Sequence, residues 1–243
     1  MGINMLTKET LSNFANCTTV EGNLLILSDS FKGVQHFAPD PKYAEFHGPI
    51  TPADLEQLST IRTVTGYIRI DGSHSGMTNL SFLRNLEVIH GRNLMNKYAL
   101  MIIMNQYLTS LGLNSLKKIS NGNVQILENR ELCYADSMSW KSLMSSSSAA
   151  FVKNNKKADV CRAENKTCHS ECSAGGCWGP AADQCLSCAH YKFKNMCIAS
   201  CTSQPMLHDA GSLTCLACDE QCLDGCQGPV SKLCWINIGF YLR

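Results

Sequence analysis

The sequence predicts a mostly-β chain in two parts, a leucine-rich solenoid followed by small disulfide-rich modules. Two observations lead to this fold class. Leu and Ile recur at three-residue steps through the first 157 residues, and 13 of the 15 cysteines fall within the 74 residues from Cys161 to Cys234. At 243 residues the chain is long enough for one sizeable core and a small accessory region.

Four copies of one spaced pattern carry the solenoid prediction. Each copy has apolar residues three positions apart, a turn residue, and then the period-2 alternation of a short strand. The equivalent leucines Leu58, Leu83 and Leu113 are 25 and then 30 residues apart, close to the repeat length of leucine-rich solenoids. A single coil cannot bury its apolar residues, whereas stacked coils bury them together. The alternative is an ordinary β-sandwich with a leucine bias. The four copies contain Leu11, Phe14, Cys17 and Val20; Leu55, Leu58, Ile61 and Val64; Leu80, Leu83, Leu86 and Ile89; and Leu113, Leu116 and Ile119.

Two segments of this first part are expected to be surface loops. Residues 37–52 are rich in proline and separate the first two copies. Residues 145–157 contain a run of serines followed by lysines and asparagines, a polar, low-complexity composition. Trp140, just before the serine run, suggests a short helix that caps the open end of the solenoid.

The closely spaced cysteines of the second part predict a disulfide framework formed in an oxidising compartment. The framework repeats internally, since Gly176-Cys-Trp-Gly-Pro180 corresponds to Gly225-Cys-Gln-Gly-Pro229. Zinc is the alternative, because Cys185-x2-Cys188 and Cys215-x2-Cys218 have the spacing of zinc ligands and histidines lie nearby. The other, irregular gaps favour disulfides, so we expect no metal and no cofactor. The sequence also lacks a nucleophile elbow, a phosphate loop and a His-Glu-x-x-His motif, so no enzyme activity is predicted.

Charge and hydropathy limit the partners. The formal net charge is +1, with both signs mixed along the chain, so neither nucleic acid nor a membrane surface is expected as a partner. No apolar run approaches the roughly 20 residues that span a bilayer, and the start does not have the pattern of a signal peptide. Sequons at Asn16, Asn79 and Asn165 are candidate glycosylation sites. We therefore expect an extracellular or cell-surface fragment whose signal peptide and transmembrane helix lie outside this chain.

Several stretches together resemble the epidermal growth factor receptor (ErbB) family. Residues 63–67, 85–92 and 109–122, then Leu132-Cys-Tyr-Ala135 and Trp140, look like its second L domain. Residues 168–201, with Gly-Cys-Trp-Gly-Pro, look like the start of the furin-like cysteine-rich domain that follows. The resemblance implies a right-handed β-helix L domain over residues 1–160, truncated at its N-terminus, two truncated furin-like modules over 161–234, and a non-matching tail over 235–243.

The resemblance also implies a disulfide pattern that leaves Cys17 unpaired. In the family this position pairs with a cysteine further upstream, which the chain does not contain. Because Cys17 occupies a core position of the first copy, we expect it to be buried in the core; a reactive or intermolecular thiol is the alternative. The implied pairs are Cys133–Cys161, Cys168–Cys177, Cys172–Cys185, Cys188–Cys197, Cys201–Cys215, Cys218–Cys226 and Cys222–Cys234.

A growth factor docks on one sheet face of this domain in the family, and six positions match that face: Leu25, Leu27, Arg69, Asp71, Tyr98 and Ile103. The resemblance thus implies a non-catalytic fragment of a receptor tyrosine kinase that binds a polypeptide of the epidermal growth factor type and contacts other segments of the receptor ectodomain. The sequence departs from the family at two points, since Val34 replaces an acidic anchor and Arg69 replaces an apolar residue. The alternatives are a soluble decoy form, a structural L domain of the insulin-receptor type without ligand contact, and an intracellular zinc protein.

Trp178 is expected to connect the two parts. Of the two Gly-Cys-x-Gly-Pro copies, only the one nearer the solenoid carries Trp, and Gln227 occupies the same place in the other. If the indole only filled its own module, both copies should have one. We therefore predict that Trp178 inserts between the last coils, near Trp140 or Leu132, as an interdomain clamp.

Overall fold

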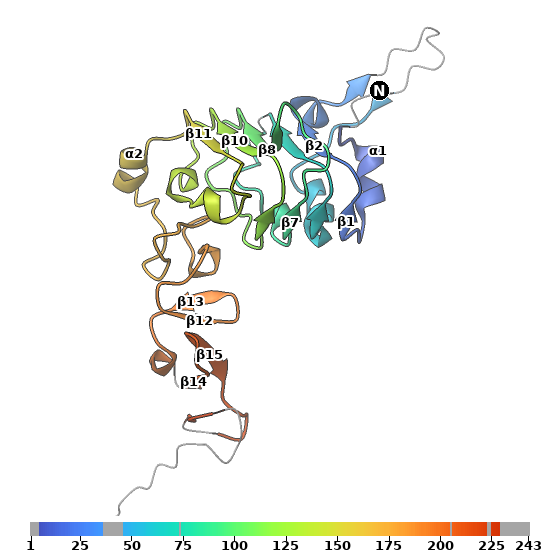
Figure 1. Cartoon of the computed structure of the whole chain (residues 1–243). Helices are drawn as coiled ribbons and strands as arrows, with labels where there is room; N and C mark the ends of the chain where they lie inside the picture. The colour runs from blue at the N-terminus through green and yellow to red at the C-terminus, as the bar shows by residue number, and fades with distance from the viewer. Residues whose placement is uncertain (1–4, 36–45, 73, 205, 223–224, 229–243) are drawn as a thin grey trace, which may run out of the picture. The chain divides into compact units, whose positions relative to one another are not determined.

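The structure, a computed structural model, describes residues 5–35, 46–72, 74–204, 206–222 and 225–228 (Figure 1). The chain divides into two compact units, Met1–Thr167 and Cys168–Arg243. The first unit consists mainly of strands and short 3-10 helices, and the second is crossed by disulfides. The predicted class, mostly β with a disulfide-rich C-terminal part, is therefore confirmed.

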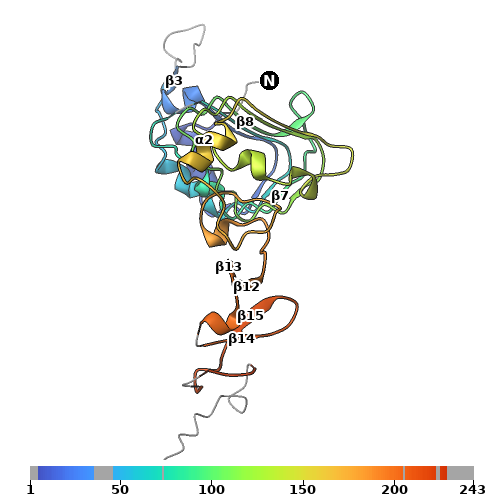
Figure 2. The ribbon, with the colours of Figure 1, turned by 90° about the vertical axis from the view of Figure 1, so that its left-hand side faces the viewer.

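Two parallel sheets organise the first unit. The shorter sheet has the order β1-β5-β7-β9, and the longer one has the order β11-β10-β8-β6-β2. In Figure 2 the chain passes repeatedly between these sheets. The short strands are Thr19–Val20 (β1), Thr63–Val64 (β5), Val88–Ile89 (β7) and Lys118–Ile119 (β9). The long sheet contains Leu24–Leu27 (β2), Ile68–Asp71 (β6), Tyr98–Ile103 (β8), Asn123–Leu127 (β10) and Ala150–Lys153 (β11).

The strand register confirms the alignment of the four sequence copies. Val64 pairs with Val20 on one side and with Ile89 on the other, and Ile89 pairs with Ile119. Each copy thus supplies one strand to each sheet, in the order in which the copies occur in the sequence. Because every one of these pairings is parallel, the β-sandwich alternative, which consists of antiparallel sheets, is wrong.

The three-residue steps place apolar side chains between the two sheets. In the second copy Leu55, Leu58, Ile61 and Val64 are all 0% exposed. Full burial of one such side chain contributes about 1.5–3 kcal/mol. Short helical turns form part of these steps in the first three copies: Lys8–Leu11 (α1) and Ser12–Phe14 (η1), then Asp54–Thr60 (η4), then Ser81–Leu83 (η5). The other described helical elements of this unit lie outside the steps and are Ser28–Phe31 (η2), Ala135–Ser137 (η6), Trp140–Ser142 (η7) and Ala158–Ala163 (α2).

The expected loop at residues 145–157 contains a strand. β11 pairs in parallel with β10, from Val124 opposite Ala150 to Leu127 opposite Lys153. Trp140 does begin a 3-10 helix and is buried, with Nε1 donating to the Ala135 carbonyl at 3.1 Å. That helix does not end the repeats, however, because the chain continues into β11. The prediction of a loop was wrong for residues 150–153, while residues 145–149 and 154–157 are turns and irregular chain. The single alternation Ala-Phe-Val-Lys is too short to stand out beside the polar residues around it.

The expected loop at residues 37–52 lies partly outside the described residues. Its described part begins with Phe46–His47 (β4), which pairs antiparallel with Val34–Gln35 (β3). The chain returns to the core at Ile50, which is 1% exposed and donates its main-chain N–H to the Ser30 carbonyl at 2.9 Å.

A ladder of three asparagines follows the ends of β8, β10 and β11. Asn129 donates to the Ile102 carbonyl at 3.0 Å and accepts from the main-chain N–H of Asn105 at 2.9 Å. Asn105 donates to the Ile103 carbonyl at 2.9 Å, and Asn155 donates to the Ile126 carbonyl at 3.0 Å. Asn105 and Asn129 are 0% exposed, so these bonds pair main-chain groups that water does not reach.

Cys17 is half-buried rather than buried in the core as expected. Its thiol donates to the Asn13 carbonyl at 3.3 Å. The equivalent residue of the next copy, Ile61, is 0% exposed. The difference arises because β1 is an edge strand, so a neighbouring repeat covers the first copy on one side only. A cavity of about 350 Å³ lies at this edge, between Leu6, Phe14, Val20 and Leu24.

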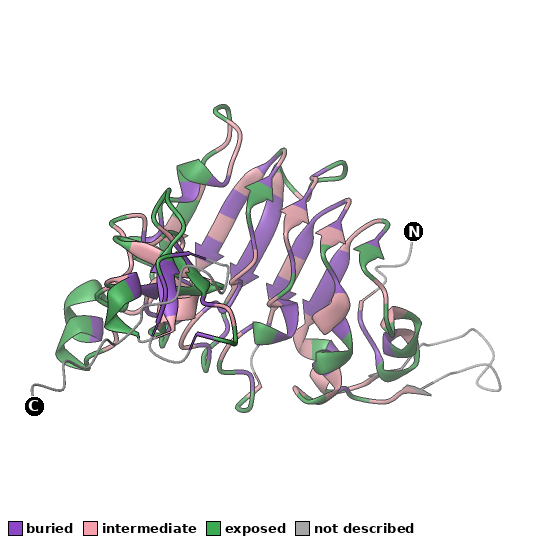
Figure 3. Cartoon of the chain, turned by 90° about the horizontal axis from the view of Figure 1, so that it is seen from below, coloured by how far each residue is buried: buried purple, intermediate pink, exposed green. Residues whose placement is uncertain are grey.

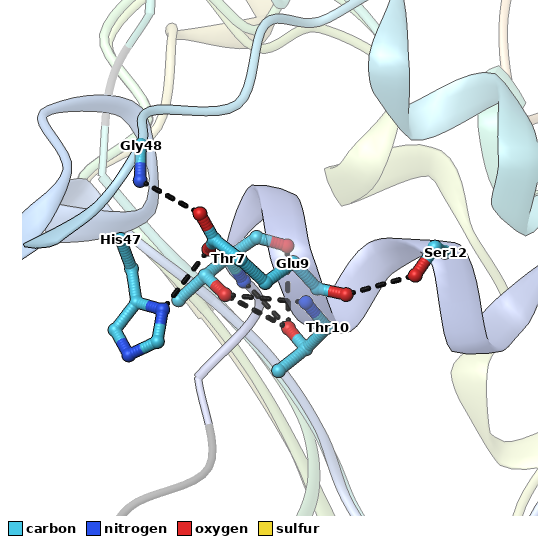
Figure 4. A network of polar contacts seen from close by, with 6 residues as sticks. All are labelled: Thr7, Glu9, Thr10, Ser12, His47 and Gly48. Atoms are coloured by element: carbon cyan, nitrogen blue, oxygen red, sulfur yellow. Dashed lines mark hydrogen bonds and ion pairs between the residues drawn. The ribbon is translucent and has the colours of Figure 1, made fainter. Parts of the chain in front are cut away.

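The first helical turn is tied to β4 by the carboxylate of Glu9 (Figure 4). Its Oε1 accepts from the main-chain N–H of Gly48 at 3.2 Å, and its Oε2 lies 3.1 Å from His47 Nδ1. Thr7 and Thr10 form a capping box at the start of the same turn. Hydrogen bonds from the main-chain N–H groups of Glu9 and Gly48 lower the pKa of Glu9 to about 2 from the usual 4.5.

This lowered pKa predicts a loss of stability in acid. Because the carboxyl binds its proton less readily in the folded state, its contribution is complete above the usual pKa and is lost as pH falls towards 2. We expect Glu9→Gln to lower the melting temperature at neutral pH but not near pH 2, where the contribution of the carboxylate is lost. Thermal unfolding of both proteins between neutral pH and about pH 2 measures the difference, with the exposed Glu21→Gln as control. A gap between wild type and Glu9→Gln that is the same at every pH would contradict the prediction.

Disulfides and one small sheet form the second unit. The sheet has the order β13-β12-β15-β14. Its core contains Ile198, Leu207 and the disulfide between Cys201 and Cys215. Such a small core buries little apolar area, so the covalent links are needed for stability. The elements are Ala182–Gln184 (η8), Tyr191–Phe193 (β12), Met196–Ile198 (β13), Cys201–Ser203 (η9), Leu207–Asp209 (β14) and Thr214–Ala217 (β15).

The structure contains six of the seven disulfides that the resemblance implies. One of them, Cys133–Cys161, lies in the first unit. The seventh, Cys222–Cys234, involves Cys234, which lies outside the described residues. The other five are Cys168–Cys177, Cys172–Cys185, Cys188–Cys197, Cys201–Cys215 and Cys218–Cys226.

Candidate functional site

The long sheet of the first unit presents two rows of side chains on its outward face. Alternation along each strand sends one set of residues inward and the next set outward, and Figure 3 shows the buried and intermediate stretches that result. Residues in register across the strands share a face. One outward row is Leu25, Arg69, Met101, Gln125 and Phe151, and the other is Leu27, Asp71, Ile103, Leu127 and Lys153. We call these ten residues the outward rows.

The structure brings together most of the predicted ligand-binding residues. Leu25, Tyr67 and Met101 form a buried apolar cluster, and Leu27, Met95, Tyr98 and Ile103 pack against it. Four of the six predicted positions are therefore in one patch, and the other two, Arg69 and Asp71, lie between them in the outward rows. Leu25 is only 5% exposed, so it offers little surface to a partner.

Leu25 and Met101 are covered partly by a turn of the same chain. Met95 and Tyr98 exchange main-chain hydrogen bonds of 3.1 and 2.9 Å across Asn96 and Lys97. Both central residues have positive φ, 49° and 75°, as a type I′ turn requires. The turn carries Met95 and Tyr98 into the apolar cluster. This turn was not among the predicted elements, although Asn at its first central position is a typical signal.

Arg69 and Asp71 form an ion pair in the middle of the outward rows. Nη2 of Arg69 lies 2.5 Å from Oδ2 of Asp71, and Nη1 lies 3.3 Å from the thioether sulfur of Met95. The side chains are 32% and 19% exposed, so the pair is largely removed from water. The Arg69 Nε atom is buried and has no hydrogen-bond partner.

Phe151, which the sequence analysis missed, extends the apolar surface to the edge strand β11. Its ring meets that of Tyr98 edge-on, with centroids 5.9 Å apart. It is 38% exposed, so part of its ring faces solvent. It was missed because its strand was expected to be a loop.

The short sheet has a different surface. Glu87 accepts from Arg62 at 2.7 Å on one neighbouring repeat and from Lys117 at 2.9 Å on the other. The two cations lower the pKa of the Glu87 carboxyl, Lys117 having the larger effect. This charged ladder is well solvated, whereas the long sheet presents apolar area, so the long sheet is the better candidate for a protein-binding surface.

The three sequons are accessible to different degrees. Asn16 and Asn165 are exposed and have positive φ, 62° and 56°. Asn79 is half-buried, and its side-chain oxygen accepts from the main-chain N–H of Ser81, the third residue of its own sequon, at 2.9 Å.

Trp178 and the cysteines with zinc-like spacing lie in the second unit. Trp178 is 1% exposed and donates its main-chain N–H to the Gln184 carbonyl at 2.7 Å; its role as a clamp stays a prediction. The four cysteines with zinc-like spacing, Cys185, Cys188, Cys215 and Cys218, are all in disulfides and are not free thiolates. Among the described residues, one group with metal-ligand spacing occurs, His208 with Cys218 and Cys226, and its two cysteines are bonded to each other.

Comparison with known proteins agrees with this arrangement of sheets and disulfides. The family described as Receptor L domain matches residues 16–144, and that described as Growth factor receptor domain IV matches residues 167–240. The epidermal growth factor receptor of Apis mellifera is 38% identical over 222 residues, covering 91% of this chain and 17% of that protein. The chain belongs to the epidermal growth factor receptor family.

Further members of the family show the same extent of similarity. The epidermal growth factor receptor of Drosophila melanogaster is 36% identical over 227 residues, 91% of this chain and 16% of that protein. The receptor tyrosine-protein kinase erbB-4 of Homo sapiens is 36% identical over 248 residues, 96% of this chain and 18% of that protein. The chain spans less than a fifth of the length of these receptors.

The matched ranges fit the structural units. The Receptor L domain match contains both strands of all four repeats, and the domain IV match begins one residue before the second unit. No helix among the described residues is both long enough and apolar enough to cross a bilayer.

Proposed function

We propose that this chain is an extracellular part of a receptor tyrosine kinase and binds a polypeptide of the epidermal growth factor type without catalysis. The observation that carries the proposal is the apolar patch on the long sheet, where four of the six family-derived positions lie together. The charged ladder of the short sheet supports the choice of face. Contact with other segments of the receptor ectodomain is part of the same proposal.

The finer fold assignment belongs to this proposal. The two parallel sheets, with strands added in the order of the sequence copies, support a right-handed β-helix in residues 1–160. Residues 161–234 are then two furin-like modules, residues 235–243 are a separate tail, and Trp178 clamps the modules to the β-helix. Disulfides in such number support an extracellular or cell-surface location, in which Asn16, Asn79 and Asn165 are available to glycosylation.

Calorimetric titration of a polypeptide of the epidermal growth factor type onto the chain tests the proposal. Ile103 lies in an outward row and is half-buried, so Ile103→Asp should weaken binding about tenfold, or ~1.4 kcal/mol. Val88, equally half-buried but on the short sheet, provides the matched control, and Val88→Asp should leave the affinity unchanged. Absence of binding at high micromolar concentration of the wild-type chain would contradict the proposal.

One observation favours a second candidate, a structural L domain without ligand contact. The turn at Asn96 and Lys97 already covers part of the patch, and Leu25 and Met101 are only 5% and 3% exposed. In that case the patch is internal packing of the domain. The two candidates differ in the titration, since a structural domain binds no growth factor. A soluble decoy would bind as the receptor fragment does.

A further inference from the structure

The charges on the outward face of the long sheet are concentrated in one pair. Arg69 stands in register between Leu25 and Met101, and Asp71 stands between Leu27 and Ile103. Among the ten residues of the outward rows, all of which the structure describes, the only other charge is that of Lys153 on the edge strand β11. A single ion pair is therefore surrounded by apolar side chains where the proposed ligand would dock.

The contacts of this pair are unequal. Asp71 accepts from Arg69 Nη2, so the carboxylate already has a cationic partner. Arg69 is less well satisfied, because its Nη1 meets only the weak thioether acceptor of Met95 and its Nε has no partner. A guanidinium has five N–H donors and no acceptor, so the groups of this pair that remain unsatisfied are donors, and they need a further acceptor.

We infer that Arg69 and Asp71 neutralise each other, so that this face selects an apolar polypeptide surface that offers Arg69 a main-chain carbonyl. Arg69 is thereby a specificity-determining residue, and Asp71 is the residue that positions and neutralises it. This inference rests on the proposed function and states which chemistry the site takes.

Electrostatics exclude the simpler alternatives. A cationic side chain of a partner that approached Asp71 would have to displace Arg69, exchanging one ion pair for another with little gain. A partner carboxylate that approached Arg69 would meet the repulsion of Asp71 at close range. A neutral acceptor meets neither cost, since it leaves the pair intact and satisfies a donor that would otherwise be desolvated without a partner.

Three variants test the inference: Arg69→Met, Asp71→Leu and the double variant. Each single substitution leaves one charge unpaired in an apolar surface, whereas the double substitution leaves none. In thermal unfolding, each single variant should lower the melting temperature by about 3 °C, and the double variant by no more than either single one. In titrations with a polypeptide of the epidermal growth factor type, each single variant should bind about tenfold more weakly. The double variant should bind no more weakly than Arg69→Met, because it lacks the same donor to the partner's carbonyl but leaves no charge unpaired.

Ionic strength provides a second readout. Binding by a neutral face should change less than about twofold between roughly 0.05 and 0.5 M salt, because no net charge is brought together. A steep loss of affinity with salt would overturn the inference. So would loss of binding in Asp71→Leu together with stronger binding in Arg69→Met, which would make Asp71 a direct anchor for a cation. The converse result would make Arg69 an anchor for an acid and would overturn it equally.

The unfolding measurements separate this inference from the proposed function. A wild-type chain that binds no growth factor polypeptide contradicts the proposed function. The melting temperatures of the three variants are measured without ligand and still test whether Arg69 and Asp71 neutralise each other. If the shift of the double variant equals the sum of the two single shifts, the inference is overturned; a smaller shift supports it. Leu127 lies in the outward row of Asp71 but remote from the pair, so Leu127→Ala is the control. Its shift in melting temperature should add to that of either single variant.

Discussion

Replacing Cys133 and Cys161 together by alanine is expected to lower the free energy of unfolding of the first unit by about 3–4 kcal/mol. The disulfide joins residues 28 positions apart, and its loss enlarges the unfolded ensemble by the freedom of that whole loop. The loop contains β11 and the buried Trp140, so the last strand of the long sheet should lose protection first. Chemical denaturation measures the free energy, and hydrogen exchange measures the order in which strands open.

Cys17→Ala is the matched control, since it removes a cysteine that is in no disulfide and only half-buried. Its effect should stay below about 1 kcal/mol. If the double variant and Cys17→Ala proved equally stable, or if β11 exchanged no faster than β10 in the double variant, the disulfide would not be what holds the end of the repeats.

Asn129→Ala is expected to destabilise the first unit by about 3 kcal/mol, because more than one buried main-chain group loses its partner. The Asn129 side chain accepts from the main-chain N–H of Asn105 at 2.9 Å and donates to the Ile102 carbonyl at 3.0 Å, and Asn129 is 0% exposed. Water cannot replace these bonds without opening the strand ends. Urea denaturation should show the loss as a lower midpoint with an unchanged slope.

Asn85→Ala provides the comparison for this ladder. The Asn85 amide also donates to a main-chain carbonyl, that of Ser59 at 2.8 Å, but in an exposed position. Water can replace it, and the loss should not exceed about 1 kcal/mol. Equal losses at the two asparagines would show that burial of the ladder does not matter.

The repeat pattern could be predicted from the sequence because its period is set by geometry. Three-residue steps followed by alternation recur four times, and the register aligns Val20, Val64, Ile89 and Ile119 as the pattern required. Features that depend on a single local interaction were harder to predict. β11 has one short alternation, and its pairing with β10 depends on a neighbour that sequence periodicity does not reveal.

The candidate site was predictable only as a face. The family resemblance implied Leu27, Asp71 and Ile103 as residues of one sheet face, and the register of β2, β6 and β8 puts them in one row. The pairing of Arg69 with Asp71 follows from the same alternation, since residues two apart on a strand share a face. The contact of Met95 with this face could not be predicted, because it depends on how the turn at Asn96 and Lys97 folds back over the sheet.

The exposure of Cys17 shows a different limit of sequence reasoning. Its place in the repeat is that of the buried Ile61, so the pattern alone assigns both residues the same environment. Burial also depends on a second neighbour, and the edge strand β1 has only one among the strands that the structure describes. A repeat position thus defines the direction of a side chain, whereas its cover depends on the adjacent copies.

Repeat length and strand register are independent of each other in this fold. Equivalent residues of neighbouring copies, Val20, Val64, Ile89 and Ile119, are 44, 25 and 30 residues apart, yet their strands keep the same register. Part of the 30-residue spacing is the turn at Asn96 and Lys97, which lies against the outward face of the long sheet and outside the leucine core. Insertions and deletions at such corners can therefore alter what the surface recognises while the stacked interior stays as it is. A chain of this architecture can therefore change that surface through loop length alone, with little risk to its folding.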